Sequence, residues 1–271
     1  MTRRRAWARA RAAALAVAGA TSLAASPALA APPWVERELT LPRHDWAFDF
    51  GLGVGHYDQG PRPGQSGTGP GLNAEMKVSV IHHLELGFRG GFRFGDEAKF
   101  SRADQYGRIF DRQTFGTRGE GVASPEVKVL GEVVDTGTFE LGLEGRIILP
   151  TEAPNHFATQ FGMPFAIHIA DFVRLDTGVY IPIVFDDRTP TAISVPFDAW
   201  FQVSPRVWLG PMTGFRHDTP PSHDSASLGF GVGYQVHRIV DLKWMLLWPR
   251  ITDDRGGTNV GGGFGAQIRI E

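Results

Sequence analysis

The chain of 271 residues contains no cysteine. This absence excludes a disulfide framework, a thiolate metal site and a cysteine nucleophile. The chain also lacks an apolar run of the roughly 18 residues that a membrane-spanning helix requires. Apolar residues make up 42% and charged residues 21% of the sequence, which is too apolar for a disordered chain and too mixed for a helical membrane bundle. The class of fold must therefore be read from the periodicity.

Clustered positive charge is found only in residues 1–30. These residues contain five arginines and no acid, an apolar stretch at 12–23 and a small–x–small sequence at 28–30, the pattern of a cleaved secretory signal. A membrane anchor is the alternative, but the apolar stretch is short and interrupted. Without the five arginines, 22 basic and 29 acidic side chains remain, a net charge of −7 that argues against nucleic acid as a partner. We predict a signal peptide at 1–30 and a periplasmic tail at 31–44.

From residue 45 onward the sequence alternates with a period of two. In residues 46–57 the even positions hold Trp, Phe, Phe, Leu, Val and His, while the odd positions are mostly Ala, Asp and Gly. Such alternation is typical of β-strands with one apolar face. It recurs about twelve times, over residues 46–57, 72–80, 84–94, 126–129, 139–149, 165–169, 173–185, 193–203, 207–215, 227–236, 240–248 and 260–270.

Long and short connections alternate between these strands. The long ones are expected at 59–71, 95–121, 150–162, 186–191, 217–225 and 251–258, and short turns lie between them. This rhythm and an even strand number predict an all-β fold, a closed antiparallel up-and-down barrel over 45–271 with both termini at the short-turn end. Pro182 and Pro196 fall within strands and predict a bulge or local opening there, because proline cannot donate to the ladder.

The polar phase of the strands carries most of the charge. Placing it in hydrocarbon would cost about 2–4 kcal/mol for each midplane Lys or Arg, so we expect apolar side chains to face lipid and charges to face the lumen. Closure also satisfies the backbone hydrogen bonds of a sheet in lipid. The predicted pore-lining residues are Asp49, Glu75, Lys77, Glu85, Arg89, Arg93, Glu126, Lys128, Glu140, Glu144, Arg146, His168, Arg174, Asp176, Asp198, Asp241, Lys243 and Arg269.

These features resemble the bacterial outer-membrane β-barrel class over residues 45–270. The signal ending at 28–30, the period of two, and aromatics at strand ends such as Trp46, Phe185 and Trp248 carry the resemblance. It implies outer-membrane lipid, lipopolysaccharide and the barrel-assembly machinery as partners. The strand number is similar to the twelve-strand group, which includes small-solute channels and an outer-membrane phospholipase. The chain departs from the class at its end, where Arg269-Ile270-Glu271 replaces the usual terminal aromatic residue.

Two interpretations of the lumen remain open. Acids and bases can line a narrow passive channel for small polar or charged solutes, or pair across the lumen and plug a structural or adhesive barrel. Inner-face glycines favour open space, because they remove side-chain bulk. They are Gly51, Gly53, Gly87, Gly91, Gly229, Gly231, Gly233, Gly261, Gly263 and Gly265. The loop 95–121 could constrict the pore, contact lipopolysaccharide or form a mobile surface.

Other chemistry has weaker support. A lipid hydrolase needs a serine and a histidine together on the outer wall, and neither His56 nor His168 has a serine partner in its strand pattern. His217-Asp218 and His223-Asp224 form a doublet that matches no known metal-ligand spacing. We therefore expect a channel rather than an enzyme, without metal or cofactor, in the outer membrane.

Overall fold

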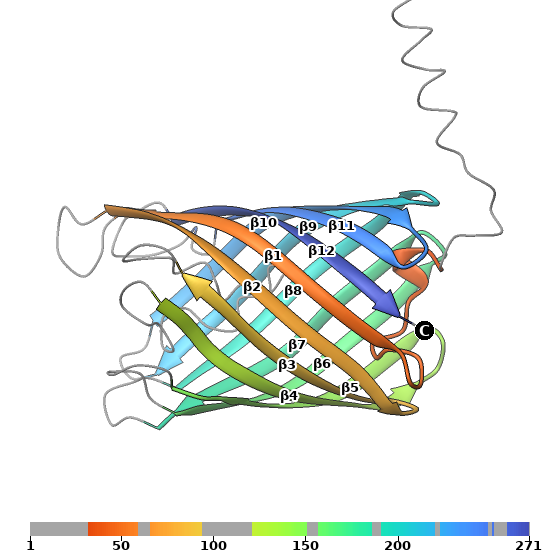
Figure 1. Cartoon of the computed structure of the whole chain (residues 1–271), viewed down its shortest axis with the longest axis horizontal. Helices are drawn as coiled ribbons and strands as arrows, with labels where there is room; N and C mark the ends of the chain where they lie inside the picture. Colours follow the sequence, from red (N-terminus) through yellow and green to blue (C-terminus); the bar gives the residue numbers. More distant parts are fainter. Residues whose placement is uncertain are drawn as a thin grey trace, which may run out of the picture. The chain divides into compact units, whose positions relative to one another are not determined.

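The computed structural model describes residues 32–58, 66–93, 121–150, 157–185, 191–219, 223–248, 251 and 259–270. Within them twelve antiparallel strands form a closed barrel in which neighbours in sequence are neighbours in space and β1 pairs with β12 (Figure 1). None of the described residues belongs to a helix long and apolar enough to cross a membrane. The strands are β1 Trp46–Asp58, β2 Ser66–Ile81, β3 Leu84–Arg93, β4 Gly121–Asp135, β5 Phe139–Ile148, β6 Ala158–Ala170, β7 Val173–Val184, β8 Thr191–Ser204, β9 Val207–Thr219, β10 His223–His237, β11 Val240–Trp248 and β12 Asn259–Ile270.

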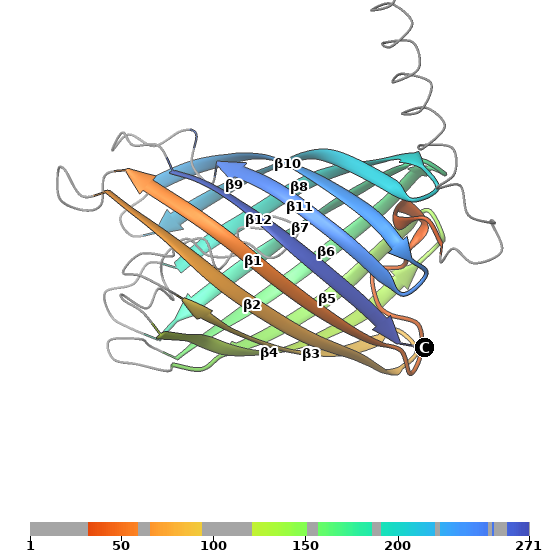
Figure 2. The same cartoon turned by 45° about the horizontal axis from the view of Figure 1, so that its top comes forward.

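The structure confirms the predicted fold class, strand number and topology. Five connections of two or three residues lie at one end of the barrel, hereafter the short-turn end. The first residue of β1, Trp46, pairs with Ile270 at the end of β12, so the chain enters and leaves at this same end (Figure 2). The β4–β5 turn is closed by Gly137 at φ 72°, a left-handed conformation that glycine adopts without strain.

The two phases of each strand face opposite sides, as the alternation requires. Side chains of the apolar phase project from the outer surface, where Leu143 is 54% and Phe264 is 68% exposed. Polar-phase residues point inward and are buried, among them Asp49 and Asp176. An apolar outer surface around a charged interior suits a barrel surrounded by hydrocarbon rather than by water.

Several strands are longer than their alternation predicted. β2 begins at Ser66, β4 at Gly121, β6 at Ala158 and β10 at His223, and β9 continues to Thr219. The expected loops 59–71, 150–162 and 217–225 are therefore shorter than predicted. The extra residues are rich in glycine, proline and small polar side chains, which hide a strand pattern, yet they pair with long neighbours such as β1. Pro196 remains paired with Gly214 of β9, but the β7–β8 register is interrupted beside it, between Thr177↔Phe197 and Tyr180↔Ser194, as the predicted local opening requires. Thr177 Oγ1 of β7 donates to the carbonyl oxygen of Pro196.

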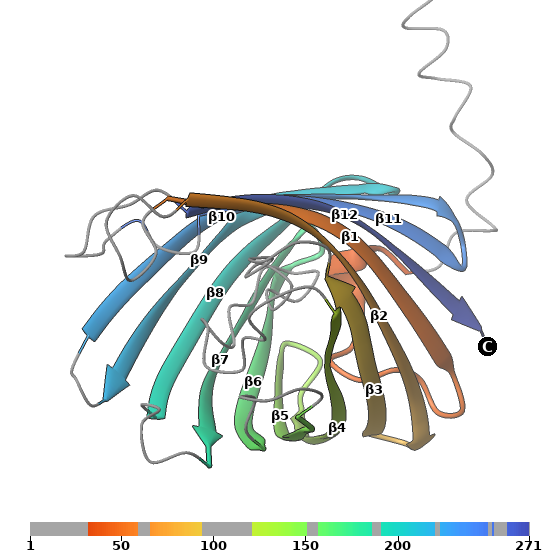
Figure 3. The same cartoon turned by 60° about the vertical axis from the view of Figure 1, so that its left-hand side comes forward.

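The segment before β1 lies inside the barrel, where it contacts residues of the inner wall. A single 3-10 turn, η2 (Trp34–Glu36), begins the segment and buries Trp34 and Val35. Residues 37–45 then return along the wall to the start of β1. Figure 3 shows this red-to-orange segment enclosed by the strands. We refer to residues 34–44 as the N-terminal segment.

Candidate functional site

Charged side chains of β1 to β5 form a continuous ladder on the inner wall. Lys77 of β2 lies 2.8 Å from Asp49 of β1. Lys128 of β4 bonds Glu85 of β3 at 2.7 Å and lies 3.5 Å from Glu75 of β2. These ion pairs join strands that are adjacent or once removed, so they run along the wall and do not span the lumen.

The ladder continues through β5. Arg146 bonds Glu126 of β4 at 2.7 Å and Glu144 of its own strand at 3.2 Å, and all three are largely shielded from solvent. Buried ions need such partners because an unpaired buried charge is costly. The pairing neutralises much of the wall locally without filling the space in front of it.

The opposite half of the lumen carries bulky apolar side chains among its charges. Trp200 of β8, Trp208 and Met212 of β9, Tyr180 of β7 and Leu247 of β11 are all at most 3% exposed. The sequence analysis assigned only charges and glycines to this inner phase. Buried charged residues such as Arg174 and Asp198 share the same half, so charge lines the lumen on both sides and aromatic rings are added on the β7–β11 side.

Glycines of the inner wall serve two different purposes. A Cβ at Gly233 would lie 1.9 Å from the indole of Trp208, and one at Gly231 would lie 2.7 Å from that of Trp200. The expectation that β10 glycines leave open space is thus wrong, because aromatic rings from β8 and β9 fill it. In contrast, a Cβ at Gly51 would meet only a backbone oxygen at 3.9 Å, so open space remains beside β1.

A cavity lies along the glycine-rich β1–β12 flank. It is open on one side and has a volume of about 70 Å³, room for a few water molecules, and its lining includes Asp49, Asn73, Glu75 and Arg89. The glycines at 51, 53, 261, 263 and 265 supply most of the remaining wall, with Met245 and Leu247 at one side. The barrel is therefore hollow at this flank, although its other flank is filled.

The N-terminal segment crosses the lumen at the short-turn end. Its polar contacts reach seven strands. On one side His44 N donates to Ser79 O of β2, Thr40 Oγ1 to Glu132 of β4 and Leu39 N to Glu140 of β5. On the other sides the contacts are His168 Nδ1 of β6 to Val35 O, Arg174 of β7 to Arg37 O, Val35 N to Gln202 Oε1 of β8 and Arg37 to Asp241 of β11. Contacts on so many sides show that this segment, and not pairing of wall charges, occupies the centre of the barrel there.

Two side chains anchor the N-terminal segment to opposite walls. The ring of Trp34 stacks on Trp208 at 5.1 Å with an interplanar angle of 8°, and Lys243 Nζ lies 4.7 Å from the centre of the Trp34 ring. Across the lumen, Leu39 lies over Gly142, where a Cβ would approach Leu39 Cδ2 to 2.9 Å. Both anchors depend on glycines of the wall, because Trp208 packs against Gly233 and Leu39 packs against Gly142.

Arg37 is the electrostatic anchor of the same segment. Its guanidinium donates two hydrogen bonds to Asp241, at 2.5 and 3.2 Å, and Asp241 is fully buried. Arg269 Nη2 lies 3.4 Å from the same carboxylate. The guanidinium of Arg37 also lies 5.1 Å from the centre of the Trp34 ring. A bidentate, charge-assisted contact of this kind fixes both position and orientation.

The predicted pore-lining residues occupy inner-phase positions of the strands. Arg93 is the exception to this comparison, because its side chain lies outside the described residues. Those buried are Asp49, Glu85, Arg89, Lys128, Glu140, Glu144, Arg146, Arg174, Asp176, Asp198, Asp241 and Lys243. Those of intermediate exposure are Glu75, Lys77, Glu126, His168 and Arg269. Whether solutes pass along them stays a prediction.

Other candidate residues are placed differently from their expected positions. His217 and Asp224 were expected in a long loop but pair across β9 and β10, with 2.6 Å between Nδ1 and Oδ1. The loop at 95–120 and the side chain of His56 lie outside the described residues. His168 faces inward and bonds Val35 O and Glu140, so it does not lie on the outer wall where a lipid hydrolase would need its base.

The sequence analysis missed the N-terminal segment as part of the site. It described residues 31–44 as a periplasmic tail without assigning any contact to Trp34, Arg37 or Thr40. The sequence did contain a signal, a tryptophan and an arginine in the short stretch before the first strand. Tryptophan side chains are usually buried in folded proteins, so a tryptophan is unexpected in a tail that contacts nothing.

No family model matches the sequence, and no curated protein matches it. Solved structures do share its fold. An outer-membrane channel of Pseudomonas putida F1 matches with a TM-score of 0.65 at 11% identity, over 85% of this chain and 97% of that one. The NanC porin matches with 0.55 at 4% identity, over 82% and 100%, and the KdgM porin with 0.53 at 7% identity, over 82% and 99%. The chain thus has the fold of outer-membrane channels and porins.

Proposed function

We propose that this protein is a narrow passive channel for small solutes in the outer membrane. The observation that carries the proposal is the cavity beside the charged ladder, which leaves a hollow flank in a barrel whose outer surface is apolar. The fold shared with the P. putida channel and the two porins supports it. In this placement the short turns face the periplasm, and lipid and lipopolysaccharide surround the barrel.

The lining suggests the class of solute. Asp49, Glu75 and Arg89 present both signs of charge to the cavity, while Met245 and Leu247 present apolar surface. Polar or charged groups of a solute can exchange water for these side chains along the ladder. We therefore propose small polar or charged solutes, and the apolar side accommodates the hydrocarbon part of such a molecule. The function needs neither a cofactor nor a catalytic pair.

Single-channel conductance of the refolded mature protein, residues 31–271, in a planar bilayer tests the proposal. Discrete steps that scale with salt concentration are expected. Replacing Arg89, which is buried beside the cavity, with Gln should shift ion selectivity toward cations because a fixed positive charge is lost. Arg238→Gln, at an exposed arginine of the β10–β11 turn, is the matched control and should leave selectivity unchanged.

A second candidate function is a closed barrel that acts through its outer loops. The N-terminal segment favours it, because its contacts with seven strands obstruct the short-turn end. A silent bilayer with a folded, protease-resistant barrel would support this alternative. If Arg89→Gln lowers stability without changing any current, the channel proposal is wrong and the ladder is structural.

A further inference from the structure

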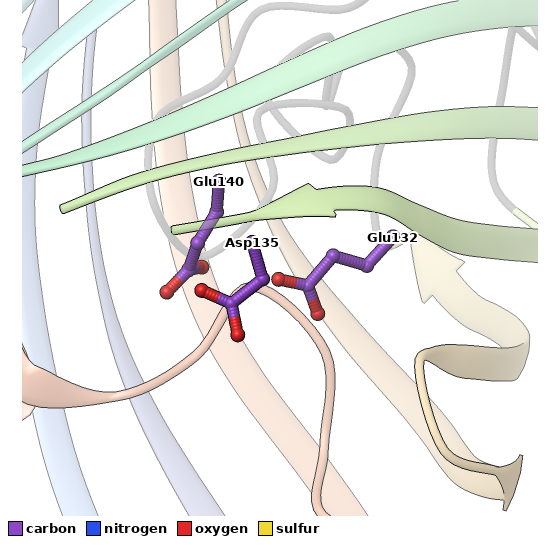
Figure 4. A group of neighbouring side chains, drawn as sticks. All are labelled: Glu132, Asp135 and Glu140. Atoms are coloured by element: carbon purple, nitrogen blue, oxygen red, sulfur yellow. The ribbon is translucent and has the colours of Figure 1, made fainter. Parts of the chain in front are cut away.

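Three carboxylates converge at the β4–β5 turn. Glu132 and Asp135 end β4, Glu140 begins β5, and one oxygen from each lies within 4.8 Å of the others (Figure 4). In a regular strand residues three apart face opposite sides. Here a bulge between Glu132 and Val134 shifts the register, so that Asp135 opposes Glu140 on the same face as Glu132. The bulge is therefore what brings the three acids together.

The deepest of these carboxylates has an oxygen without a donor. Glu132 Oε2 accepts hydrogen bonds from Thr40 Oγ1 at 2.9 Å and His83 Nδ1 at 3.0 Å. Its Oε1 is buried and has no hydrogen-bond partner, although the whole side chain is only 1% exposed. Figure 4 shows the carboxylate of Glu132 directed toward Asp135. A buried carboxylate oxygen that faces other carboxylates calls for a cation.

The N-terminal segment brings a fourth carboxyl group to the turn. Leu39 N donates to Glu140 Oε2 at 2.6 Å and Thr40 Oγ1 donates to Glu132. Glu38 directly precedes these two residues, is exposed, and interacts electrostatically with Glu132, Glu140 and Asp135. The basic groups recorded against these acids are histidines, His83 on Glu132 and His168 on Glu140.

We propose that Glu38, Glu132, Asp135 and Glu140 form a Ca²⁺ site that ties the N-terminal segment to the β4–β5 turn. Ca²⁺ takes six to eight oxygen ligands in flexible geometry and accepts both carboxylates and water. An all-carboxylate set suits this hard cation better than Zn²⁺, which prefers nitrogen and sulfur. The bound ion offsets the repulsion among four acids and gives Glu132 Oε1 its missing partner. The site does not depend on whether the barrel conducts.

Calorimetric titration of CaCl₂ into the chelator-treated mature protein tests the site. One ion per chain is expected. Asp135 is exposed and at a turn, so Asp135→Asn should leave the fold intact and weaken binding roughly ten-fold or more, because Ca²⁺ affinity follows the charge of its ligands. The matched control is Asp171→Asn, an exposed aspartate of the β6–β7 turn, which should bind as the parent protein does. No saturable heat, or equal binding by Asp135→Asn, overturns the proposal.

Trypsin cleavage after the exposed Arg43 tests the connection to the N-terminal segment. Ca²⁺ should slow this cleavage in the parent protein and in Asp171→Asn, but not in Asp135→Asn or Glu38→Gln. Binding that leaves the cleavage rate unchanged would show that Glu38 is not a ligand and overturn the tether. Neither readout uses conductance, so their failure is distinct from failure of the channel proposal.

Discussion

Individual glycines decide which parts of the lumen are filled. Trp208 lies over Gly233, Trp200 over Gly231 and Leu39 over Gly142, at separations that no Cβ could occupy without a shift. Glycine at these positions is required by close approach of a bulky partner and not by backbone conformation. The same residue type beside the β1–β12 cavity has no such partner. A glycine on the inner wall is thus either covered by a bulky side chain or borders open space, depending on its neighbours.

Gly233→Ala tests the seat of the tryptophan stack. The new Cβ would displace the Trp208 ring, 1.9 Å away, and with it the stack on Trp34. We expect a loss of about 1–3 kcal/mol in the free energy of unfolding, typical of overpacking, and a changed tryptophan fluorescence spectrum. Gly90→Ala is the control, because nothing lies within 4 Å of a Cβ there. Equal stability of the two variants would refute a tight seat at Gly233.

Asp241→Asn tests the electrostatic anchor. The carboxylate is fully buried between Arg37 and Arg269, so the variant leaves two guanidinium groups without their counter-ion. Removing one partner of a buried pair costs about 3–5 kcal/mol, measured by urea unfolding in detergent micelles. The exposed Asp171→Asn should be neutral. A stability loss common to both variants would contradict a special role for Asp241.

At the scale of the element, the N-terminal segment converts an up-and-down barrel into one that is obstructed at a single end. A segment this short cannot fold alone, because one 3-10 turn gives few hydrogen bonds for the entropy that it loses. Its conformation depends on the barrel wall, through Trp34 on Trp208, Arg37 on Asp241 and Leu39 over Gly142. Loss of an anchoring side chain of the segment itself should therefore loosen the segment without unfolding the strands.

Trp34→Ala tests this division between segment and barrel. The variant loses the stack on Trp208, worth about 0.5–1.5 kcal/mol beyond its buried area, as well as the contact with Lys243. We expect faster trypsin cleavage at Arg43 and larger single-channel conductance, with an unchanged melting temperature of the barrel. Trp46→Ala, on the outer face of β1 where the ring is 40% exposed, should change neither cleavage nor conductance. Conductance that stays at the parent value would place the constriction elsewhere.

For the whole molecule, the distribution of apolar surface sets its environment. Large apolar side chains project outward from every strand, and most described charged residues of the strands lie inside, apart from residues near strand ends such as Asp135 and Asp224. In water such an outer surface would be an aggregation hazard far beyond the patches that soluble monomers expose. In hydrocarbon the same surface is favourable, and closure of the sheet leaves no unpaired edge.

Leu143→Arg tests this orientation. Leu143 lies at the middle of β5 and is 54% exposed on the outer face. A guanidinium at that depth in a bilayer should cost about 2–4 kcal/mol of folding free energy, measured by urea titration in lipid vesicles. Leu143→Phe keeps the side chain apolar and should be close to neutral. If arginine is tolerated as well as phenylalanine, the outer face of β5 does not contact lipid.

The sequence predicted the fold well because alternation is a local signal. In each strand from β1 to β12 the alternation of polar and apolar residues indicates which face is polar, and turns such as Asp135–Gly137 contain residues that tolerate left-handed backbone. The prediction failed where this alternation is absent. Half of residues 66–71 of β2 are glycine and the others are Ser, Thr and Pro, so their strand conformation comes from pairing with β1. Likewise, the bulge at Val133 reverses the phase of Asp135, which simple alternation places on the other face.

The sequence by itself determined the all-β class, the closed barrel, the inward direction of charge and the common end of both termini. These follow from a period of two and from the cost of placing charge in hydrocarbon, which each residue expresses without reference to distant ones. The tertiary structure alone decided that ion pairs run along the wall, that aromatic rings fill the β8–β10 glycines, and that residues 34–44 enter the lumen. The contacts of the N-terminal segment include pairs more than a hundred positions apart, for example Val35 with Gln202. No local pattern encodes which partner a side chain will meet across a closed barrel.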